Sequence, residues 1–571
     1  MNEAARISAS ERQPQPETRE LNFYNADPSL RALLSLYMSG DELAHMTPHF
    51  ARLGFMVGAE LDDLAQDADL NPPVLKPRDR QGNNRQSVEK HPAYRRMEDL
   101  AFGDFALASM SHRPAFGWPD PLSSASKYAL TYLFAQSEFG LLCPVNMTDS
   151  LTRTIRRFAG KDLLARYLPG LTEEDGLAHT QGAMFMTERF AGSDVGATET
   201  RAVAEGDHWR LYGEKWFCSN ADAGLALVLA RPEGSGEGTR GLGLFLMPRE
   251  KPDGTPNDYR IVRLKKKLGT RSMASGEITL EGAQAWLVGE LSEGFRQMAE
   301  MVNQSRLSNA VRSAGMMRRA LHESLAVACG REAFGKRLID LSLARRQLMK
   351  MVVPAEQALS MVLFTAQCLD EADKGDEQAQ AMRRVLTPLV KFRACRDARK
   401  VTGDAMEMRG GCGYIEEWIE QRLVRDAHLG SIWEGTSNII ALDVIRASRK
   451  AQAHKALHAR LNKMIETLEA GLDSELSERL DAAVGLVDEV AAADGTHDAH
   501  ARAAASGLYN IASAILLADE ARRLDDPYRA HVATMVLRHR LSARDPLELP
   551  GEENAAEGAV LDMLVTARSD A

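Results

Sequence analysis

The sequence predicts a multidomain α+β protein, with a helical region, a small β region, a second helical region and a helical extension in that order. The chain has 571 residues, which is too long for one ordinary hydrophobic core. Apolar residues recur at three- and four-residue spacing over most of its length, but the period becomes strand-like in one central stretch. We therefore expect four domains, at residues 1–180, 181–285, 286–450 and 451–571.

The first region is expected to be mainly helical. The segments "SLRALLSLYM", "HFARLGFMVGAELDDLA" and "SLTRTIRRFAGKDLLARYL" have the apolar spacing of helices that pack on one face. Between the last two, "LNPPVLKPRDRQGNNRQ" is rich in Pro, Asn and Gly, so a loop is expected there.

The central region has the pattern of a β domain. The segment "RAVAEGDHWRLYGEKWFCS" reads as two strands around a turn at Glu205-Gly206-Asp207. The runs "LALVLA" and "LGLFLMP" are separated by the flexible segment "RPEGSGEGTRG", and "GEITLEGAQAWLV" continues the strand signal.

Helical spacing returns after residue 286. A long helix is expected in "GFRQMAEMVNQSRLSNAVRSAGMMRRALHESLAVACGREAF", which would place Arg331 and Phe334 on one face. Two further long helices and the Gly-rich turn "RGGCGY" follow. Beyond residue 450, "SERLDAAVGLVDEVAAA" and "LYNIASAILLADEARRL" predict amphipathic helices.

Composition limits the possible functions. The net charge of −10 gives no overall bias towards nucleic acid. The six cysteines are scattered without metal-type spacing, so no metal site is expected and a reducing cytoplasm is the simplest location. No apolar run approaches a membrane span, and the first 20 residues lack the apolar core of a signal peptide.

Several short motifs suggest a ligand site, although each has an ordinary structural alternative. Gly192 and Ser193 in "TERFAGSD" could hold a phosphate, or form a simple turn. The neighbouring rings of Trp216 and Phe217 should point to opposite faces of a strand, one offering a flat surface, although both could be core residues. The turn "RGGCGY" fits a helix C-cap.

The segment "GSIWEGTSNII" contains one carboxylate, Glu434, on a Gly-Thr-Ser turn before an apolar helix. Thr436 or Ser437 could cap that helix. A glutamate in a capping turn is the plain structural interpretation. A catalytic carboxylate is the functional one.

The order and spacing of these motifs are more specific than any one of them. Thr-Glu-x-x-x-Gly-Ser-Asp, Lys-Trp-Phe-x-Ser-Asn, "KLGTRSMAS", Arg-x-x-Phe-Gly, Gly-Gly-x-Gly-Tyr and Trp-Glu-Gly-Thr-Ser-Asn occur in one chain. Over residues 90–450 the chain resembles the acyl-CoA dehydrogenase family of flavoproteins. The segments "NPPVLKPRDRQGNNRQSVEKHPAY" and "LLCPVNMT", with the helical extension, resemble the bacterial adaptive-response branch of that family.

The resemblance implies an N-terminal α-helical domain, a middle β-barrel-like domain and a C-terminal four-helix domain, followed here by an additional α-helical domain. It also implies a homotetramer, with FAD between the middle and C-terminal domains. Arg331 and Phe334 match positions that reach the FAD of a neighbouring subunit, and Glu407 and Gly411 match the turn near the adenosine end of FAD. The other implied cofactor positions are Met186, Thr187, Gly192, Ser193, Phe217, Cys218, Ser219, Trp433, Gly435, Thr436 and Asn438.

Glu434 matches the family's catalytic base, which removes the α-proton of an acyl-CoA thioester while a β-hydride passes to the flavin. Such a base requires burial that raises its pKa, and an apolar pocket beside Trp433 is expected to supply it. Some members carry the base just before an arginine on an earlier helix, but Ser305 occupies that position here. The implied substrate is an acyl-CoA with a short or branched acyl chain, and the implied partner is an electron-transfer acceptor, a flavoprotein or a similar protein.

The sequence departs from the family pattern at several positions. Trp433 replaces a tyrosine, which would narrow the pocket, and Glu407 replaces a glutamine near FAD. Ser342 replaces another cofactor-binding glutamine, and Arg189 replaces the proline of Thr-Glu-Pro.

A DNA-binding role is the alternative that the adaptive-response resemblance raises. Residues 451–571 contain 12 basic and 21 acidic side chains, so this extension is acidic and disfavours DNA. One basic stretch, residues 521–544, has six arginines and two aspartates. Because it could equally be a solvated helix face, we rank DNA binding below dehydrogenation.

Overall fold

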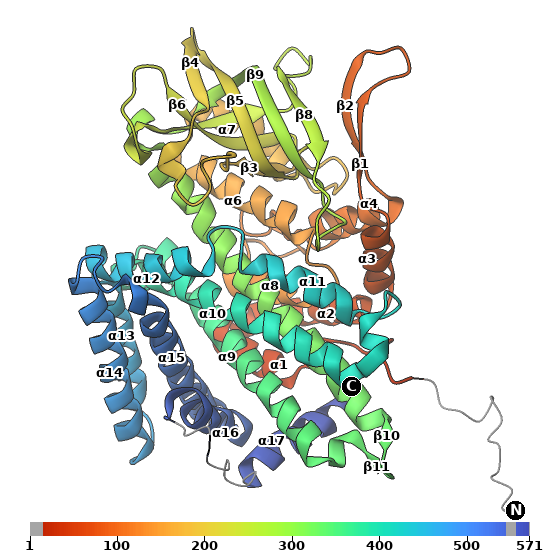
Figure 1. The fold of residues 1–571 in the computed structure, drawn as a ribbon, viewed down its shortest axis with the longest axis vertical. Coiled ribbons are helices and arrows are strands. Elements are labelled where there is room, and N and C mark those ends of the chain that lie inside the picture. The colour runs from red at the N-terminus through yellow and green to blue at the C-terminus, as the bar shows by residue number, and fades with distance from the viewer. Residues whose placement is uncertain (1–14, 544–546, 548–554, 570–571) are drawn as a thin grey trace, which may run out of the picture.

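The computed structural model describes residues 15–543, 547 and 555–569, so the residues before 15 that bear on the signal-peptide question lie outside it. A β-barrel stands at one end of an elongated body of helices (Figure 1). The expected succession of helical, β, helical and further helical regions is confirmed.

The N-terminal region is helical, as predicted. Its elements are α1 (Pro28–Tyr37), α2 (Gly40–Val57), α3 (Glu60–Leu70), α4 (Pro92–Glu98), a π-helical turn (Asp99–Asp104), α5 (Ser124–Phe134), α6 (Leu142–Phe158) and α7 (Lys161–Leu171). The predicted helical stretches 49–65 and 150–168 are each broken into two helices, at Gly58 and at Gly160.

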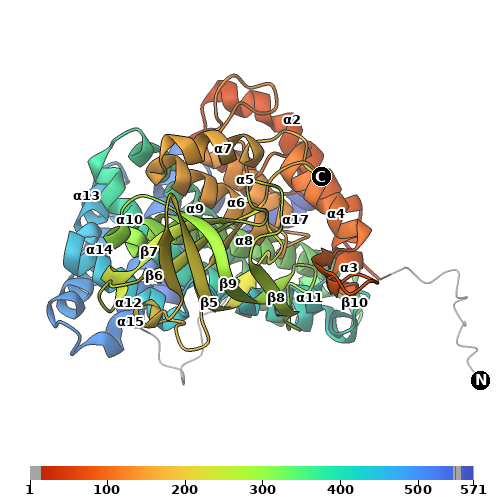
Figure 2. The same ribbon diagram turned by 90° about the horizontal axis from the view of Figure 1, so that it is seen from above.

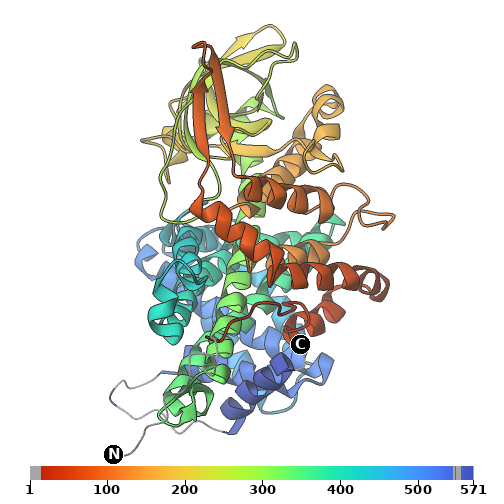
Figure 3. The ribbon, with the colours of Figure 1, turned by 90° about the vertical axis from the view of Figure 1, so that its right-hand side faces the viewer.

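The segment expected to be a loop forms a hairpin instead. Strands β1 (Val74–Arg78) and β2 (Asn84–Glu89) pair antiparallel and rise beside the barrel (Figure 3). Gln86 attaches the hairpin to the barrel, because its Oε1 accepts a 2.6 Å hydrogen bond from the Ile261 backbone N–H. The strands are largely exposed, so they lack the apolar alternation by which a strand is recognised in sequence.

The central region is a closed antiparallel-rich barrel. Strand neighbours run in the order β3-β6-β4-β5-β9-β7, β7 returns to pair with β6, and β8 pairs with β9. The strands are β3 (Gly182–Phe185), β4 (Arg201–Glu205), β5 (His208–Ser219), β6 (Leu225–Pro232), β7 (Gly243–Pro248), β8 (Tyr259–Leu264) and β9 (Ser275–Leu287).

The apolar run of β6 is explained by burial on both faces. Ala226 and Val228 face the barrel core. Leu225, Leu227 and Leu229 point the other way and pack with residues of α6 and of the long helix α8 (Gly294–Gly330). A strand buried on both sides has no polar face, so its sequence is continuously hydrophobic. This packing seats the barrel on the helical body, as the view from above shows (Figure 2).

Long helices form the rest of the molecule. The second helical region contains α8 (Gly294–Gly330), α9 (Ser342–Asp373), α10 (Glu377–Arg409), α11 (Glu420–Gly430) and α12 (Ser437–Ala451). The extension contains α13 (Ala453–Ile465), α14 (Leu472–Ala492), α15 (Ala501–Leu524), α16 (Pro527–Val536), a π-helical turn (Leu537–Leu541) and α17 (Ala555–Ser569).

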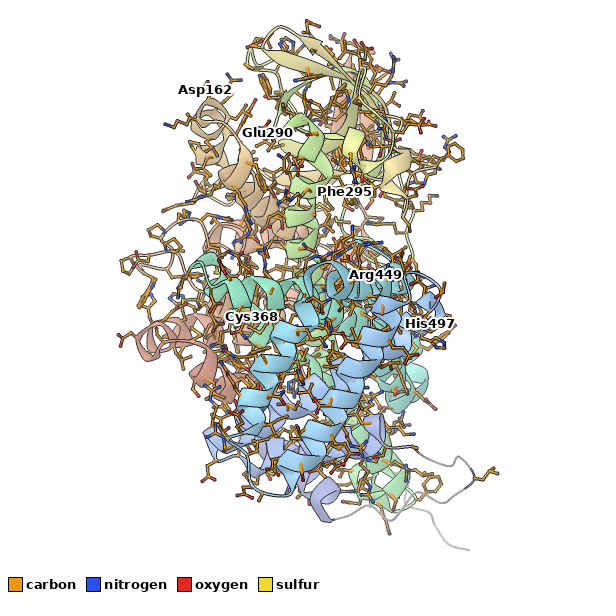
Figure 4. The ribbon with its side chains drawn as sticks, turned by 90° about the vertical axis from the view of Figure 1, so that its left-hand side faces the viewer. Asp162, Glu290, Phe295, Cys368, Arg449 and His497 are labelled. Carbon is orange, nitrogen blue, oxygen red and sulfur yellow. The ribbon has the colours of Figure 1, made fainter. Side chains whose placement is uncertain are left out.

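The extension packs directly on the helical body. Residues of α1–α6, α8–α12 and α13–α17 share one hydrophobic core. At one end, Arg449 of α12 lies near His497 in the loop after α14 (Figure 4), and its Nε donates to the Ala491 carbonyl at 2.8 Å. Because the helical regions share this core, the limits at 180, 285 and 450 stay sequence predictions.

Two helices, α9 and α15, are long and apolar enough to cross a membrane by length and composition alone. Most of the apolar window of each is buried inside the molecule. Their hydrophobicity is therefore explained by the core of the helical body.

Candidate functional site

The turn that contains Glu434 connects α11 to α12 and has an unusual backbone. Glu434 has φ 54° and Gly435 has φ 110°, so two consecutive residues are left-handed. Glycine adopts this conformation readily, but for a glutamate it is strained by roughly 1–3 kcal/mol. Such strain persists only where the surrounding structure fixes the backbone.

Two cations hold this backbone in place. Arg306 of α8 donates from Nε to the Glu434 carbonyl at 3.1 Å. The buried Lys391 of α10 donates from Nζ to the carbonyls of Trp433 at 2.9 Å and Gly435 at 2.5 Å. The three carbonyls around Glu434 are therefore fixed from two helices. The sequence did not single out Lys391, which lies in the apolar run "LTPLVKF".

The carboxylate is positioned by an amide. Asn309 of α8 donates from Nδ2 to Glu434 Oε2 at 2.9 Å, and the Glu434 side chain is half-buried. Among the described residues, the Glu434 backbone N–H has no hydrogen-bond acceptor, so it is available to a ligand. Asn309 was also missed, although it lies three residues after Arg306 and hence on the same helix face.

The surroundings of Glu434 are less apolar than predicted. Trp433 stacks on Phe139 with ring centroids 5.6 Å apart, as an apolar wall would require. The guanidinium of Arg312, however, lies 4.9 Å from each of these rings. Burial raises the pKa of the neighbouring Cys143 thiol to about 12, so that thiol is neutral. A purely apolar pocket beside Trp433 is therefore wrong, because a buried cation forms part of it.

The predicted helix cap is only half right. Thr436 occupies the N-cap position of α12, but its side chain accepts no hydrogen bond from the helix. Ser437 Oγ instead accepts from Arg396 at 3.4 Å. Thr436 and Asn438 are exposed, and their contact with a cofactor stays a prediction.

The Thr-Glu motif has a structural role in the barrel. Burial alone would raise the pKa of Glu188, but the Lys215 ammonium at 2.7 Å and bonds from Thr200 lower it overall. Glu188 thereby anchors the segment that carries Met186 and Thr187, which are both half-buried.

The loop that follows Glu188 carries the residues predicted to lie by a pyrophosphate. Gly192 and Ser193 are exposed, and a Cβ added to Gly192 would meet nothing within 4 Å. The backbone is therefore open to a ligand at this point, as a phosphate-binding turn requires.

The two adjacent aromatic residues do not divide between core and surface as expected. A register shift between Lys215 and Cys218 interrupts the pairing of β5 with β9, so the simple alternation fails there. Trp216 is half-buried, and Phe217 is exposed with Lys265 Nζ 4.5 Å from its ring centroid. Cys218 is fully buried in the barrel core, so its side chain does not face a cofactor.

The predicted cofactor positions on the barrel, from Met186 to Ser219, could together hold a flavin nucleotide. The Trp216 backbone N–H donates to the Thr187 carbonyl at 2.9 Å, which places the Met186–Thr187 segment beside Phe217. Ser219 and Glu434 both interact with Cys143, which links this strand to the turn that contains Glu434. The exposed Phe217 ring and the open Gly192–Ser193 turn match a planar ring that carries phosphates.

A second group of predicted cofactor positions lies elsewhere on the chain and consists of Arg331, Phe334, Glu407 and Gly411. Arg331 and Phe334 are not on a helix: α8 ends at Gly330, and Glu332–Ala333 pairs with Lys336–Arg337 as the hairpin β10–β11. Phe334 and Gly335 both have positive φ, as a two-residue hairpin turn requires. The expectation of a shared helical face is therefore wrong, because the Phe-Gly pair favours a turn.

This second group is nevertheless assembled. Arg331 Nη1 donates to the Arg409 carbonyl at 3.1 Å, beside the 3₁₀ turn Gly410–Tyr414 and near Glu407 and Gly411, which are both exposed. Asn309 and Gly330 stand 21 residues apart on α8, so about 30 Å separates this group from Glu434 along the helix. The two groups are therefore far apart along α8 within one chain.

The alternative positions do not compete with Glu434. Ser305 is fully buried and accepts a 2.6 Å hydrogen bond from Asn146 Nδ2. Ser342 is the exposed first residue of α9. Lys265, just after β8, pairs with Glu277 at 2.6 Å.

Comparison with known proteins matches the chain to known families over most of its length. Residues 13–175 match the adaptive response protein AidB N-terminal domain, residues 183–283 the acyl-CoA dehydrogenase middle domain and residues 292–448 the acyl-CoA dehydrogenase C-terminal domain. AidB of Escherichia coli is 35% identical over 417 residues, covering 70% of this chain and 74% of that protein. Acyl-CoA dehydrogenase family member 11 of Caenorhabditis elegans is 32% identical over 437 residues, covering 74% and 70%.

A solved structure extends the likeness to the whole chain. Caenorhabditis elegans ACDH-11, in complex with C11-CoA, has a TM-score of 0.85 at 27% identity and covers 98% of this chain and 97% of its own. The protein belongs to the acyl-CoA dehydrogenase family, whose members are FAD-binding flavoproteins, and it is an oxidoreductase that acts on acyl-CoA. Within that family it is an AidB-like acyl-CoA dehydrogenase.

Proposed function

We propose that this protein dehydrogenates a short or branched-chain acyl-CoA between its α and β carbons, with Glu434 as the base. The observation that carries the proposal is the geometry of the catalytic turn. A strained glutamate is held by Arg306 and Lys391, its carboxylate accepts from Asn309, and its own N–H is unoccupied. Strain of this kind is typical of functional sites.

The turn supplies two groups for the reaction. The Glu434 carboxylate would accept the α-proton, and its backbone N–H would donate to the thioester oxygen as negative charge develops there. FAD, held by the segments that contain Thr187, Phe217 and Thr436, supplies the acceptor for the β-hydride. Fixed donors are effective here because they need no reorganisation during the reaction.

The surroundings support a compact acyl group. Trp433 and Phe139 stack beside the base, and the cationic head of Arg312 occupies space next to both rings. A long saturated chain would have to pack against this buried cation. We further propose a cytoplasmic homotetramer, in which Arg331 and Phe334 reach the FAD of a neighbour, with an electron-transfer flavoprotein as the acceptor.

DNA binding is the second candidate, and a group of arginines favours it. Burial and the charges of Arg502, Arg393 and Arg399 together lower the pKa of Arg396, so positive charge is concentrated between α10 and α15. Arg396 also contacts Ser437 in the catalytic segment, so the same charges suit a cofactor phosphate.

The predicted basic stretch gives DNA binding little support. Within its described part, residues 521–543, Arg529 is fully buried. Arg522 and Arg523 both pair with Asp519. DNA binding therefore stays second, and loss of salt-dependent DNA affinity in Arg396→Gln/Arg502→Gln would be needed to raise it.

The proposed function is tested by an anaerobic visible spectrum of the purified protein, titrated with straight and branched acyl-CoAs of four to six carbons. We expect bleaching of the flavin band by wild type and a loss of roughly 10²-fold or more in its rate for Glu434→Gln with FAD retained. The exposed Glu417→Gln is the matched control and should behave as wild type. Unchanged bleaching by Glu434→Gln would refute the assignment of the base.

A further inference from the structure

Arg312 is a buried cation beside the proposed base. It lies one helical turn beyond Asn309 on α8, roughly 4.5 Å along the axis, and its side chain is fully buried. Its Nε donates to the Ser308 carbonyl on its own helix at 3.3 Å. Nη1 and Nη2 have no hydrogen-bond partner within the described part of the chain.

Within the described residues no carboxylate pairs directly with this charge, and Glu434 acts on it only from beyond ion-pair distance. The described residues place no carboxylate oxygen within 4.0 Å of an Arg312 nitrogen, unlike the other fully buried arginines Arg318 and Arg529, which each pair with glutamate. The guanidinium instead lies against the rings of Phe139 and Trp433, and the Cys143 thiol beside it is neutral. A cation–π contact offsets only part of the cost of burying a cation.

Two further polar atoms around the base are buried without partners. They are Trp433 Nε1, a donor on the ring that Arg312 touches, and Asn309 Oδ1, on the amide that holds Glu434. Buried polar groups in proteins are almost always satisfied, so a cluster of orphaned atoms calls for a ligand or ordered water. Three of these four atoms are donors, and the guanidinium carries a full charge, so an anionic acceptor suits them best.

We propose that Arg312 selects the substrate, which is an acyl-CoA whose acyl chain carries a carboxylate at the end remote from the thioester. This inference rests on the proposed function, because it assumes that the acyl chain enters beside Glu434. A carboxylate would accept from both Nη atoms of Arg312 and compensate the buried charge. A methyl-terminated chain would leave the guanidinium unpaired, and the binding affinity would suffer accordingly.

The test measures equilibrium binding separately from turnover. Dissociation constants are obtained by calorimetry on the FAD-loaded protein, for matched acyl-CoAs of four to six carbons that end in methyl, hydroxyl or carboxylate. Wild type is expected to bind the carboxylate-terminated thioester about 10- to 100-fold more tightly than its methyl-terminated partner. Arg312→Met should remove or reverse this preference. Arg312→Lys, which keeps the charge but loses the planar fork, should retain part of it.

A matched control lies on the same helix. Arg296 is exposed at the start of α8, so Arg296→Met removes a charge of the same kind far from the base and should leave the preference unchanged. Equal or tighter binding of the methyl- or hydroxyl-terminated thioester by wild type would overturn the inference. That comparison needs no variant, so it decides the matter even if Arg312→Met fails to fold.

The two proposals fail in distinguishable ways. Flavin bleaching by plain acyl-CoAs without a carboxylate preference would refute only the role of Arg312. Tight, Arg312-dependent binding of the carboxylate-terminated thioester without bleaching would uphold that role and refute dehydrogenation. Absence of binding by every thioester would overturn both.

Discussion

Replacing Arg529 by methionine should loosen the helical extension from the body of the protein. Arg529 lies on α16 and is fully buried. Its Nη2 is 2.5 Å from Glu520 Oε2 on α15, and its Nη1 is 3.3 Å from Glu356 Oε2 on α9. One side chain therefore joins two helices of the extension to a central helix of the body.

The size of the destabilisation depends on which partners the carboxylates of Glu356 and Glu520 retain in the variant. Glu356 retains Arg318 at 2.7 Å, so its charge stays compensated. Within the described part of the chain, Glu520 retains only neutral donors, the hydroxyls of Tyr37 and Ser360, both at 2.8 Å. The variant thus leaves one uncompensated buried charge, which costs about 3–5 kcal/mol. That corresponds to a roughly 10³-fold increase in the open population of the extension.

Hydrogen exchange of the α13–α16 amides, followed by mass spectrometry, measures this opening. Arg529→Met should exchange faster in these helices, whereas the barrel should be unaffected because it has its own core. The double variant Arg529→Met/Glu520→Gln should regain most of the protection, since it removes the orphaned charge. The exposed Arg502→Met on α15 is the control. Unchanged exchange in the single variant, or a double variant worse than the single, would refute the reasoning.

Three further predictions concern other parts of the molecule. Burial raises the pKa of the Asp426 carboxyl to about 7, far above its value in the unfolded chain, so its contribution to stability is complete at low pH and declines as pH rises towards 7. Between pH 5 and pH 8, the stability of Asp426→Asn relative to wild type should therefore increase by about 3 kcal/mol, as measured by thermal unfolding. A difference in stability that stays constant with pH would contradict this. Cys143, Cys218, Cys368 and Cys395 are buried, so a thiol reagent should label at most two cysteines in the native protein and six after denaturation; rapid labelling of a third would show that a core region opens. Phe334 is 96% exposed, so Phe334→Ala should leave the melting temperature of the protomer unchanged. It should weaken the affinity of the assembled protein for FAD by roughly tenfold. Unaltered FAD affinity would count against the proposed contact of Phe334 with a neighbour's cofactor.

Sequence patterns predicted the fold correctly for elements that bury one face. They failed for an exposed hairpin and for a turn that interrupts a helical pattern. The strands of the barrel and the long helices carry clear apolar periods, so their types were predicted correctly. The hairpin Val74–Glu89 is exposed on most positions, so it has no such period. The segment around Phe334 continues a helical pattern, but the Phe-Gly turn ends it.

The sequence indicated the turn of the candidate site but not the helical residues that hold this turn in place. Glu434 could be singled out because the motif Trp-Glu-Gly-Thr-Ser-Asn around it matches the position of the base in the acyl-CoA dehydrogenase family. Asn309, Lys391 and Arg312 could not be found in this way, because each is one of several buried polar residues on a long helix and no motif distinguishes it from the others. A helical period shows which residues lie on one face, but not which distant turn that face meets.

The arrangement of charge around Glu434 separates the fixing of its backbone from the chemistry of its carboxylate. Arg306 is partnered by Asp443 at 2.7 Å and donates to a carbonyl, and Lys391 donates only to carbonyls. Neither cation forms a salt bridge with the carboxylate, and a direct salt bridge in general disfavours protonation of an acid. Among the described residues only the neutral amide of Asn309 donates to that carboxylate, so it is oriented without being paired. The two cations can therefore stabilise a strained turn while the side chain stays free to take a proton. Arg312 differs from both, because its Nη atoms have no hydrogen-bond partner within the described residues and can receive a ligand.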